Sequence, residues 1–153
     1  MGVRVCKTSW LLPLPNRLGE AQISPHRPSK DPGYHSYSHC GHSLSWFPQI
    51  SRGINFACDL EHRSASNTWM AKHYGLTMQE FLARWVCTEV AAKLCNIPIL
   101  QWLKRTGLVR SLSEVEDSED CFQFVKSIPR LEICYFYSQN TGFHTAFGVK
   151  ESK

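Results

Sequence analysis

Several familiar signatures are absent from this chain of 153 residues. No stretch approaches the roughly 18–20 consecutive apolar residues that a membrane-spanning helix needs, so we expect no membrane span. The chain has no phosphate-binding loop, no dinucleotide fingerprint and no serine-hydrolase elbow. It also lacks the Cys-x-x-Cys pair with which familiar structural zinc sites begin. These absences exclude the nucleotide-binding and hydrolase classes that such motifs define.

The cysteines lack the spacing of a disulfide scaffold. All seven are scattered, and Pro13 and Pro15 cut the N-terminal hydrophobic segment too short for a secretory signal. We therefore expect reduced cysteines in a soluble intracellular protein of the cytoplasm or nucleus. A mitochondrial location is the alternative, because residues 1–50 carry five Lys or Arg against only two Asp or Glu.

Regular periodicity is missing from the first third of the chain. Six of the eight prolines fall within residues 1–50, among Ser, His and Gly, which predicts a flexible, basic, Pro- and His-rich region over residues 1–51. We expect a small globular domain over residues 52–149 and a short tail at residues 150–153.

The centre of the chain has the helical period that its front lacks. Thr77 is followed three residues later by Glu80, the pattern of a capping box that starts a helix. From there to Leu94 the apolar residues recur with a 3.6-residue period, which predicts an amphipathic helix. Glu89 and Lys93 are spaced i,i+4, so we expect them to pair along its surface.

A second helix should follow after a short corner. Pro98 lacks an N–H and displaces its predecessor from helical geometry, so the first helix must stop before it. Residues 99–105 can resume the helix at once, because proline is well tolerated at a helix start. Gly107 has the position of the left-handed residue that ends a helix.

The last third of the chain predicts one more helix and a β-hairpin. Capping boxes at Ser111 and Ser113 indicate a third helix that begins near Ser113 or Ser118, buries Phe122, Val125 and Ile128, and ends at Pro129. Residues 131–137 and 143–149 alternate in polarity around a turn at 138–142, which is typical of a hairpin. The predicted fold is therefore an α+β domain, mainly helical, with about three helices before a C-terminal β-hairpin and an irregular N-terminal region.

The segment from Glu89 to Leu108 resembles the helix-turn-helix of MerR-like and excisionase-like DNA-binding proteins. It combines an alanine-bearing first helix, a small polar corner and an aromatic, basic second helix that ends in Gly-Leu. In such proteins the second helix enters the major groove. The resemblance implies that Gln101 contacts a base edge and that Lys104 and Arg105 contact phosphates.

A histidine- and cysteine-rich stretch raises the question of a metal site. Cys40 and His42, with Cys58 and His62, would supply the four nitrogen and sulfur donors of a tetrahedral zinc ion. The other interpretation is a histidine-rich loop beside a buried cysteine.

The predicted hairpin carries the residue types of a thiol enzyme. If residues 138–142 form the loop, Phe136 pairs with His144, and Cys134 then lies on the same face, diagonal to the imidazole. Glu132 could orient that imidazole. A buried thiol and an edge-strand histidine explain the same residues without catalysis.

The function that this sequence favours is a small non-catalytic binding module that takes nucleic acid through a basic helical hairpin. The alternatives are a protein-interaction or self-association module, a Cys/His-dependent enzyme and a zinc-binding protein. Salt-sensitive binding to DNA or RNA would separate the first from the second.

Overall fold

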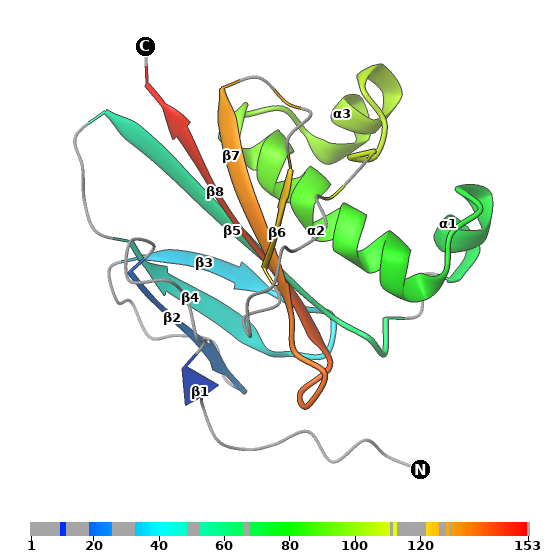
Figure 1. Ribbon diagram of the computed structural model, residues 1–153, viewed down its shortest axis with the longest axis horizontal. Helices are drawn as coiled ribbons and strands as arrows, with labels where there is room; N and C mark the ends of the chain where they lie inside the picture. The colour runs from blue at the N-terminus through cyan, green and yellow to red at the C-terminus, as the bar shows by residue number, and fades with distance from the viewer. Residues whose placement is uncertain are drawn as a thin grey trace.

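The computed structural model describes residues 10–11, 19–25, 33–48, 53–65, 68–110, 112, 122–125, 128 and 130–152. These residues form two antiparallel sheets and three helices (Figure 1). The first sheet has the order β1-β2-β4-β3, with strands Trp10–Leu11, Glu20–Ser24, Ser43–Phe47 and Tyr34–Tyr37. The second has the order β5-β8-β7-β6, with strands Ile54–His62, Phe143–Glu151, Leu131–Tyr137 and Phe122–Val125. The helices are α1 (Thr68–His73), α2 (Met78–Leu94) and α3 (Ile99–Arg105).

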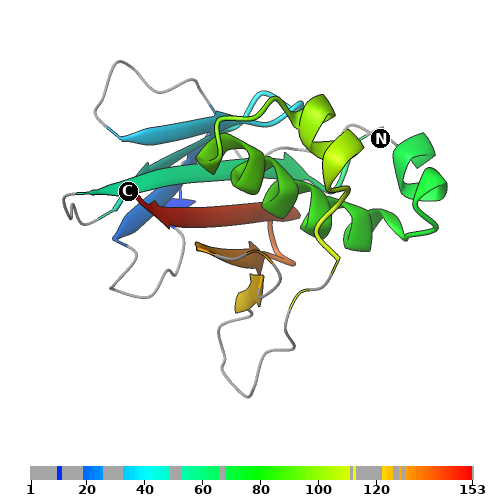
Figure 2. The same ribbon diagram turned by 90° about the horizontal axis from the view of Figure 1, so that it is seen from above.

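The second sheet is covered on both faces. One face packs against the first sheet, where Trp46 meets Phe147 with ring centroids 5.2 Å apart. The other face carries α2, which lies along the strands with α1 near its N-terminal end and α3 above it (Figures 1 and 2). Because successive residues of a strand point to opposite faces, β8 can contribute Phe147 to one core and Ala146 to the other.

The mainly helical fold class was wrong. Among the described residues, more lie in strands than in helices. The part expected to be irregular contributes four of the strands. Strand β4 is short, yet Leu44 and Trp46 are fully buried against the second sheet, so tertiary packing supplies what local periodicity did not show.

The third helix was also placed wrongly at its C-terminal half. Phe122–Val125 forms strand β6 and pairs antiparallel with β7, Val125 opposite Ile133. Ser113 and Ser118, the two predicted first residues of this helix, lie outside the described residues. Pairing with an exposed strand edge satisfies the backbone groups of this segment as well as a helix would.

The two central helices are confirmed. Thr77 caps α2 by accepting the Glu80 N–H at 3.2 Å, while the Glu80 carboxylate accepts the Thr77 N–H at 2.9 Å. Gly107 follows α3 with φ of +80°, and its N–H donates to the Leu103 carbonyl at 3.1 Å. Within the described part of the chain, no helix is both long and apolar enough to cross a membrane.

Candidate functional site

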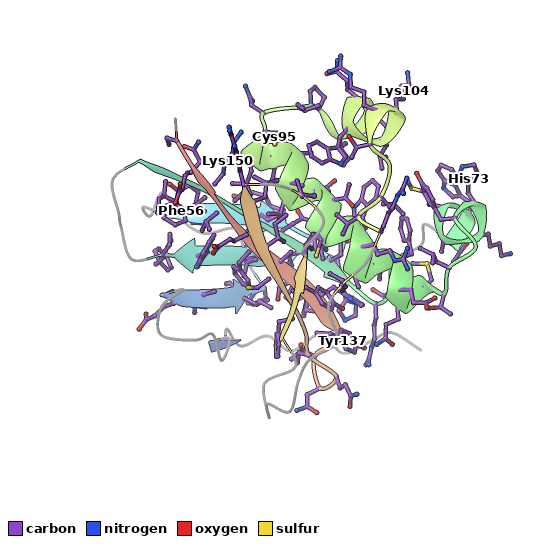
Figure 3. The ribbon with its side chains drawn as sticks, turned by 45° about the horizontal axis from the view of Figure 1, so that its top comes forward. Phe56, His73, Cys95, Lys104, Tyr137 and Lys150 are labelled. Carbon is purple, nitrogen blue, oxygen red and sulfur yellow. The ribbon has the colours of Figure 1, made fainter. Side chains whose placement is uncertain are left out.

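The predicted nucleic-acid residues lie on the outer side of α3. Gln101, Lys104 and Arg105 are all exposed, whereas Trp102 between them is buried against α2 and the second sheet. Figure 3 shows Lys104 at the outer edge of the helical layer. Burial of the tryptophan fixes the rotation of this short helix, so the polar and cationic side chains must face outward.

Helix α1 also ends in basic residues. Lys72 and His73 are exposed in its last turn. Leu103 of α3 and Met70 of α1 pack on one apolar cluster that also contains Phe81 and Leu82 of α2. Both short helices therefore pack on the same apolar cluster. We name Lys72, His73, Lys104 and Arg105 the basic helical face.

Few acidic groups offset this charge. Residues 68–110 contain six Lys or Arg and two Asp or Glu. One of the two acids, Glu80, is engaged in the capping box of α2. The other, Glu89, belongs to a cluster between α2 and the second sheet, described next. The outer side of the helical layer therefore carries a net positive charge.

An ionic cluster lies between α2 and the two sheets. The Nζ atom of Lys93 is 2.9 Å from Oδ1 of Asp59 on β5 and donates to the Cys58 carbonyl, also at 2.9 Å. Ser36 of β3 donates its hydroxyl to the same Asp59 oxygen at 2.8 Å. The Asp59 side chain is only 4% exposed, whereas the Lys93 side chain is 42% exposed. The buried carboxylate of Asp59 is thus paired with the ammonium group of a lysine whose side chain is partly exposed.

Glu89 completes the cluster as a second carboxyl group. Burial, followed by the charge of Asp59, raises the pKa of Glu89 to about 8. Oδ2 of Asp59 is buried and has no hydrogen-bond partner in the described structure. The carboxyl group of Glu89 is therefore mainly protonated at neutral pH and adds no second negative charge beside Asp59.

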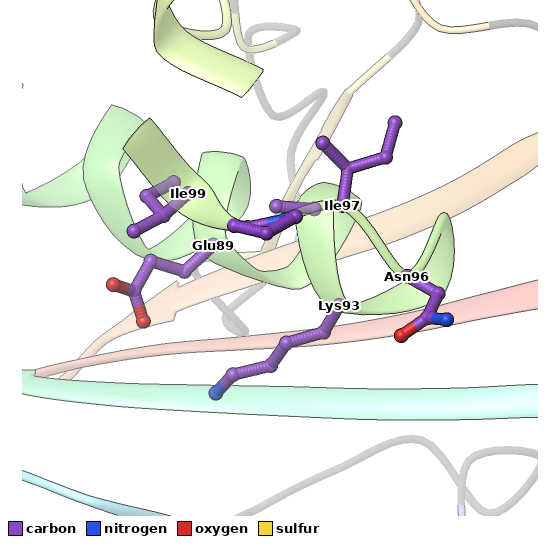
Figure 4. A pocket seen from close by; sticks show the side chains of 7 residues that line it. Glu89, Lys93, Asn96, Ile97 and Ile99 are labelled. Carbon is purple, nitrogen blue, oxygen red and sulfur yellow. The ribbon is translucent and has the colours of Figure 1, made fainter. Parts of the chain in front are cut away.

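A pocket of about 420 Å³ borders this cluster (Figure 4). Glu89 and Lys93 line it on the side of α2, and Ile97, Pro98 and Ile99 line it at the corner before α3. The predicted Glu89–Lys93 pair is therefore not a simple surface pair, since both side chains turn toward Asp59. This arrangement could not be predicted locally, because Asp59 and Ser36 come from strands of two different sheets.

The predicted Cys/His enzyme site does not assemble. The hairpin pairs Tyr137 with His144, one residue away from the expected register, so Cys134 and His144 lie on opposite faces. Cys134 is buried in the core between the sheets, and His144 accepts or donates a hydrogen bond with the Tyr135 hydroxyl at 2.6 Å. Burial lowers the pKa of His144 to about 4, and Glu132 is exposed.

The predicted zinc ligands are only partly brought together. Cys40 and His42 are neighbours, with Sγ and Nδ1 3.4 Å apart, and the rings of His42 and His62 both contact Phe143. Cys58 lies four residues before His62 on β5, roughly 13 Å along the strand. Among the described residues, no group of three or more His, Cys, Asp or Glu has the arrangement of a metal site.

The chain gave no match to protein-family models, to curated proteins or to solved structures.

Proposed function

We propose that this protein is a non-catalytic nucleic-acid-binding module that uses the basic helical face. The observation that carries the proposal is the exposure of Lys72, His73, Lys104 and Arg105 around one apolar cluster, on a helical layer with few acids. Phosphate contacts by lysine and arginine supply most of the affinity of nucleic-acid binding.

Aromatic side chains on the same layer support this function. Trp69 in the first turn of α1 is 67% exposed, and Tyr74 directly after α1 is 36% exposed. Bases stack on exposed aromatic rings at about 1–3 kcal/mol each, with little dependence on sequence. Exposed aromatic rings beside lysine and arginine suit a single strand, whose bases are free to stack.

Helix α3 supplies the polar group for a base contact. Gln101 is exposed on the same side as Lys104 and Arg105. This glutamine would reach the edge of an unpaired base while the two cations contact phosphates. Removal of the cations should therefore weaken binding to every sequence, and removal of Gln101 should weaken binding selectively.

The test is binding of the full chain to labelled single-stranded RNA, single-stranded DNA and duplex DNA at roughly 50 and 200 mM salt. The Lys104→Gln/Arg105→Gln variant removes two charges from the basic helical face. Arg130→Asn/Lys150→Gln removes two charges from the strand ends of the second sheet, and asparagine suits the φ of 67° at position 130. Figure 3 shows Lys150 on the sheet, away from Lys104.

The proposal expects micromolar binding that weakens with salt and with the first variant, and that the second variant leaves close to wild type. Absence of binding at low salt, or equal loss in both variants, would overturn it. Salt-insensitive self-association would instead support a protein-interaction module, which the exposure of Leu100 (70%) and Trp69 favours.

A further inference from the structure

Ser64 lies between two histidine rings at the end of β5. Its Oγ atom is 2.6 Å from Nδ1 of His62 and 3.5 Å from Nε2 of His39. The serine is exposed, so a ligand can reach the hydroxyl from solvent. This group shares no residue with the basic helical face.

The protonation of His62 follows from its neighbours. Nε2 lies 3.1 Å from the Thr141 carbonyl, which can only accept, so Nε2 carries the hydrogen. Nδ1 receives the Ser64 backbone N–H at 3.2 Å and must then act as an acceptor for the Ser64 hydroxyl as well. Burial lowers the pKa of His62, so the ring is neutral at pH 7 and can take a proton.

The second histidine is backed by a carboxylate. His39 lies in the turn between β3 and β4, and its Nδ1 is 2.9 Å from Oε2 of Glu61 on β5. Its Nε2 faces the Ser64 hydroxyl. Glu61, His39 and Ser64 therefore follow one another, and the carboxylate fixes the ring so that Nε2 points toward the hydroxyl. The turn after β5, closed by the Ala65 N–H and the His62 carbonyl at 2.9 Å, brings Ser64 back to both rings.

We propose that Ser64 is a nucleophile for acyl transfer from carboxylic esters, with His62 as its general base, His39 as the general acid and Glu61 as the residue that positions His39. No local sequence pattern marks this site, because His39 lies in a turn 22 residues before its partner Glu61 on β5.

The reaction balances with these groups alone and water. Ser64 Oγ attacks the ester carbonyl carbon while its proton passes to Nδ1 of His62. The bond to the leaving oxygen breaks, and protonated His39 gives that oxygen a proton from Nε2. Water then attacks the acyl-serine and gives a proton to the neutral His39, and His62 returns its proton to Ser64 as the acid leaves.

The surrounding backbone defines the substrate class. The Ser64 N–H is bound by His62 Nδ1, and the Ala65 N–H is bound by the His62 carbonyl, so neither donor is free to stabilise an oxyanion. Stabilisation of the developing oxyanion is the larger contribution in most acyl-transfer enzymes. The site therefore suits esters whose alcohol is a good leaving group, such as aryl esters, rather than amides.

The test is labelling of the full chain with a fluorophosphonate, with the modified residue located by mass spectrometry, alongside hydrolysis of p-nitrophenyl acetate. Ser64→Ala is the test variant, and Ser152→Ala is the matched control, because Ser152 is also exposed. We expect Ser64 to react at least roughly 100-fold faster than Ser152, the scale of general acid–base assistance, and Ser64→Ala to abolish both activities. Equal labelling of the two serines, or unchanged ester hydrolysis in Ser64→Ala, would overturn the proposal.

The role of Glu61 has its own readout. The Glu61→Ala variant removes the hydrogen bond to Nδ1 of His39, whereas Glu61→Gln keeps an acceptor for it. We expect Glu61→Ala to slow the labelling of Ser64 at least roughly 10-fold and Glu61→Gln to restore most of that rate, while thermal stability stays close to wild type in both. Equal labelling rates in the two variants and the wild type would exclude the positioning role.

Discussion

Two lysines of the helical layer have opposite surroundings. Lys93 of α2 turns inward, where its ammonium meets the buried carboxylate of Asp59 at 2.9 Å. Lys104 of α3 is exposed on the outer side, beside Arg105. The same residue type therefore belongs to the folded framework in one place and to a solvent-facing surface in the other. Exposure of a charge alone does not distinguish these roles, since the Lys93 side chain is itself 42% exposed.

The difference between the two is one of desolvation. Asp59 has lost its water and depends on Lys93 and Ser36 for compensation. The outer cations keep their hydration and lose nothing when the protein folds. The inner charges should therefore control the free energy of unfolding, and the outer charges should control association with a polyanion.

The largest effect should come from removal of the inner cation. Lys93→Met keeps the length of the side chain but leaves Asp59 uncompensated, and we expect a loss of about 3 kcal/mol in the free energy of unfolding, at the low end for buried pairs because Lys93 reaches solvent. Lys104→Met is the control and should change that free energy by less than about 0.5 kcal/mol. Urea unfolding at pH 7 measures both, and equal losses would remove the distinction between inner and outer charges.

The packing between α2 and β8 should also be sensitive to a single methyl group added at Gly148. A Cβ at Gly148 of β8 would meet the side chain of Val90 and would come within 2.8 Å of Leu94 Cδ1. Overpacking of this kind costs about 1–3 kcal/mol, so Gly148→Ala should lower the free energy of unfolding by that amount. Addition of Val90→Ala should restore part of the loss, because it removes the obstructing methyl groups. Strictly additive losses in the double variant would place the strain elsewhere.

Stability should fall with rising pH because of Glu89. Its pKa is raised from 4.5 to about 8, so the folded protein keeps a proton that the unfolded chain releases above about pH 4.5. The free energy of unfolding then falls between about pH 4.5 and 8 and is constant above, with a slope of at most about 1.4 kcal/mol per pH unit. Solvent screening of this partly exposed group makes the real slope smaller.

Glu89→Gln should remove that decline, since the amide has no proton to release in this pH range. Urea unfolding at pH 5, 6.5 and 8 (values chosen inside the window of about 4.5 to 8) measures the slope. Glu80→Gln is the matched control, because the bonds from Thr77 lower the pKa of Glu80 and its contribution changes only at acidic pH. A slope that persists in Glu89→Gln and vanishes in Glu80→Gln would contradict the assignment.

The contrast between inner and outer charges was visible in the sequence only in part. The boundaries of α2 and α3 depend on Thr77, Pro98 and Gly107, which act within one helical turn, so local reasoning found them. The outward position of Lys104 and Arg105 then follows from their place in the last turn of α3. The partners of Lys93 could not be found in this way, because Asp59 lies 34 residues earlier, on a strand whose pairing is non-local.

The first sheet was missed for a similar physical reason. Strand β4 pairs with β2, and Ala21 lies opposite Trp46, so the two are held together by contacts 25 residues apart along the chain. Prolines between the strands removed the local periodicity that would have indicated them. A register error of one residue in the C-terminal hairpin moved His144 to the wrong face, which shows how completely a strand-based site depends on the turn.

The smallest effect on stability should come from the outer pair, and there the measured quantity is binding. Lys104→Gln/Arg105→Gln should change the free energy of unfolding by less than about 0.5 kcal/mol, because both side chains are exposed. If both contact phosphates of a single strand, the slope of log affinity against log salt should become shallower by about 1.4, at about 0.7 per contact. Titrations at several salt concentrations measure this slope. Weaker binding with an unchanged salt slope would mean that the two residues act through the shape of α3 and not through their charge.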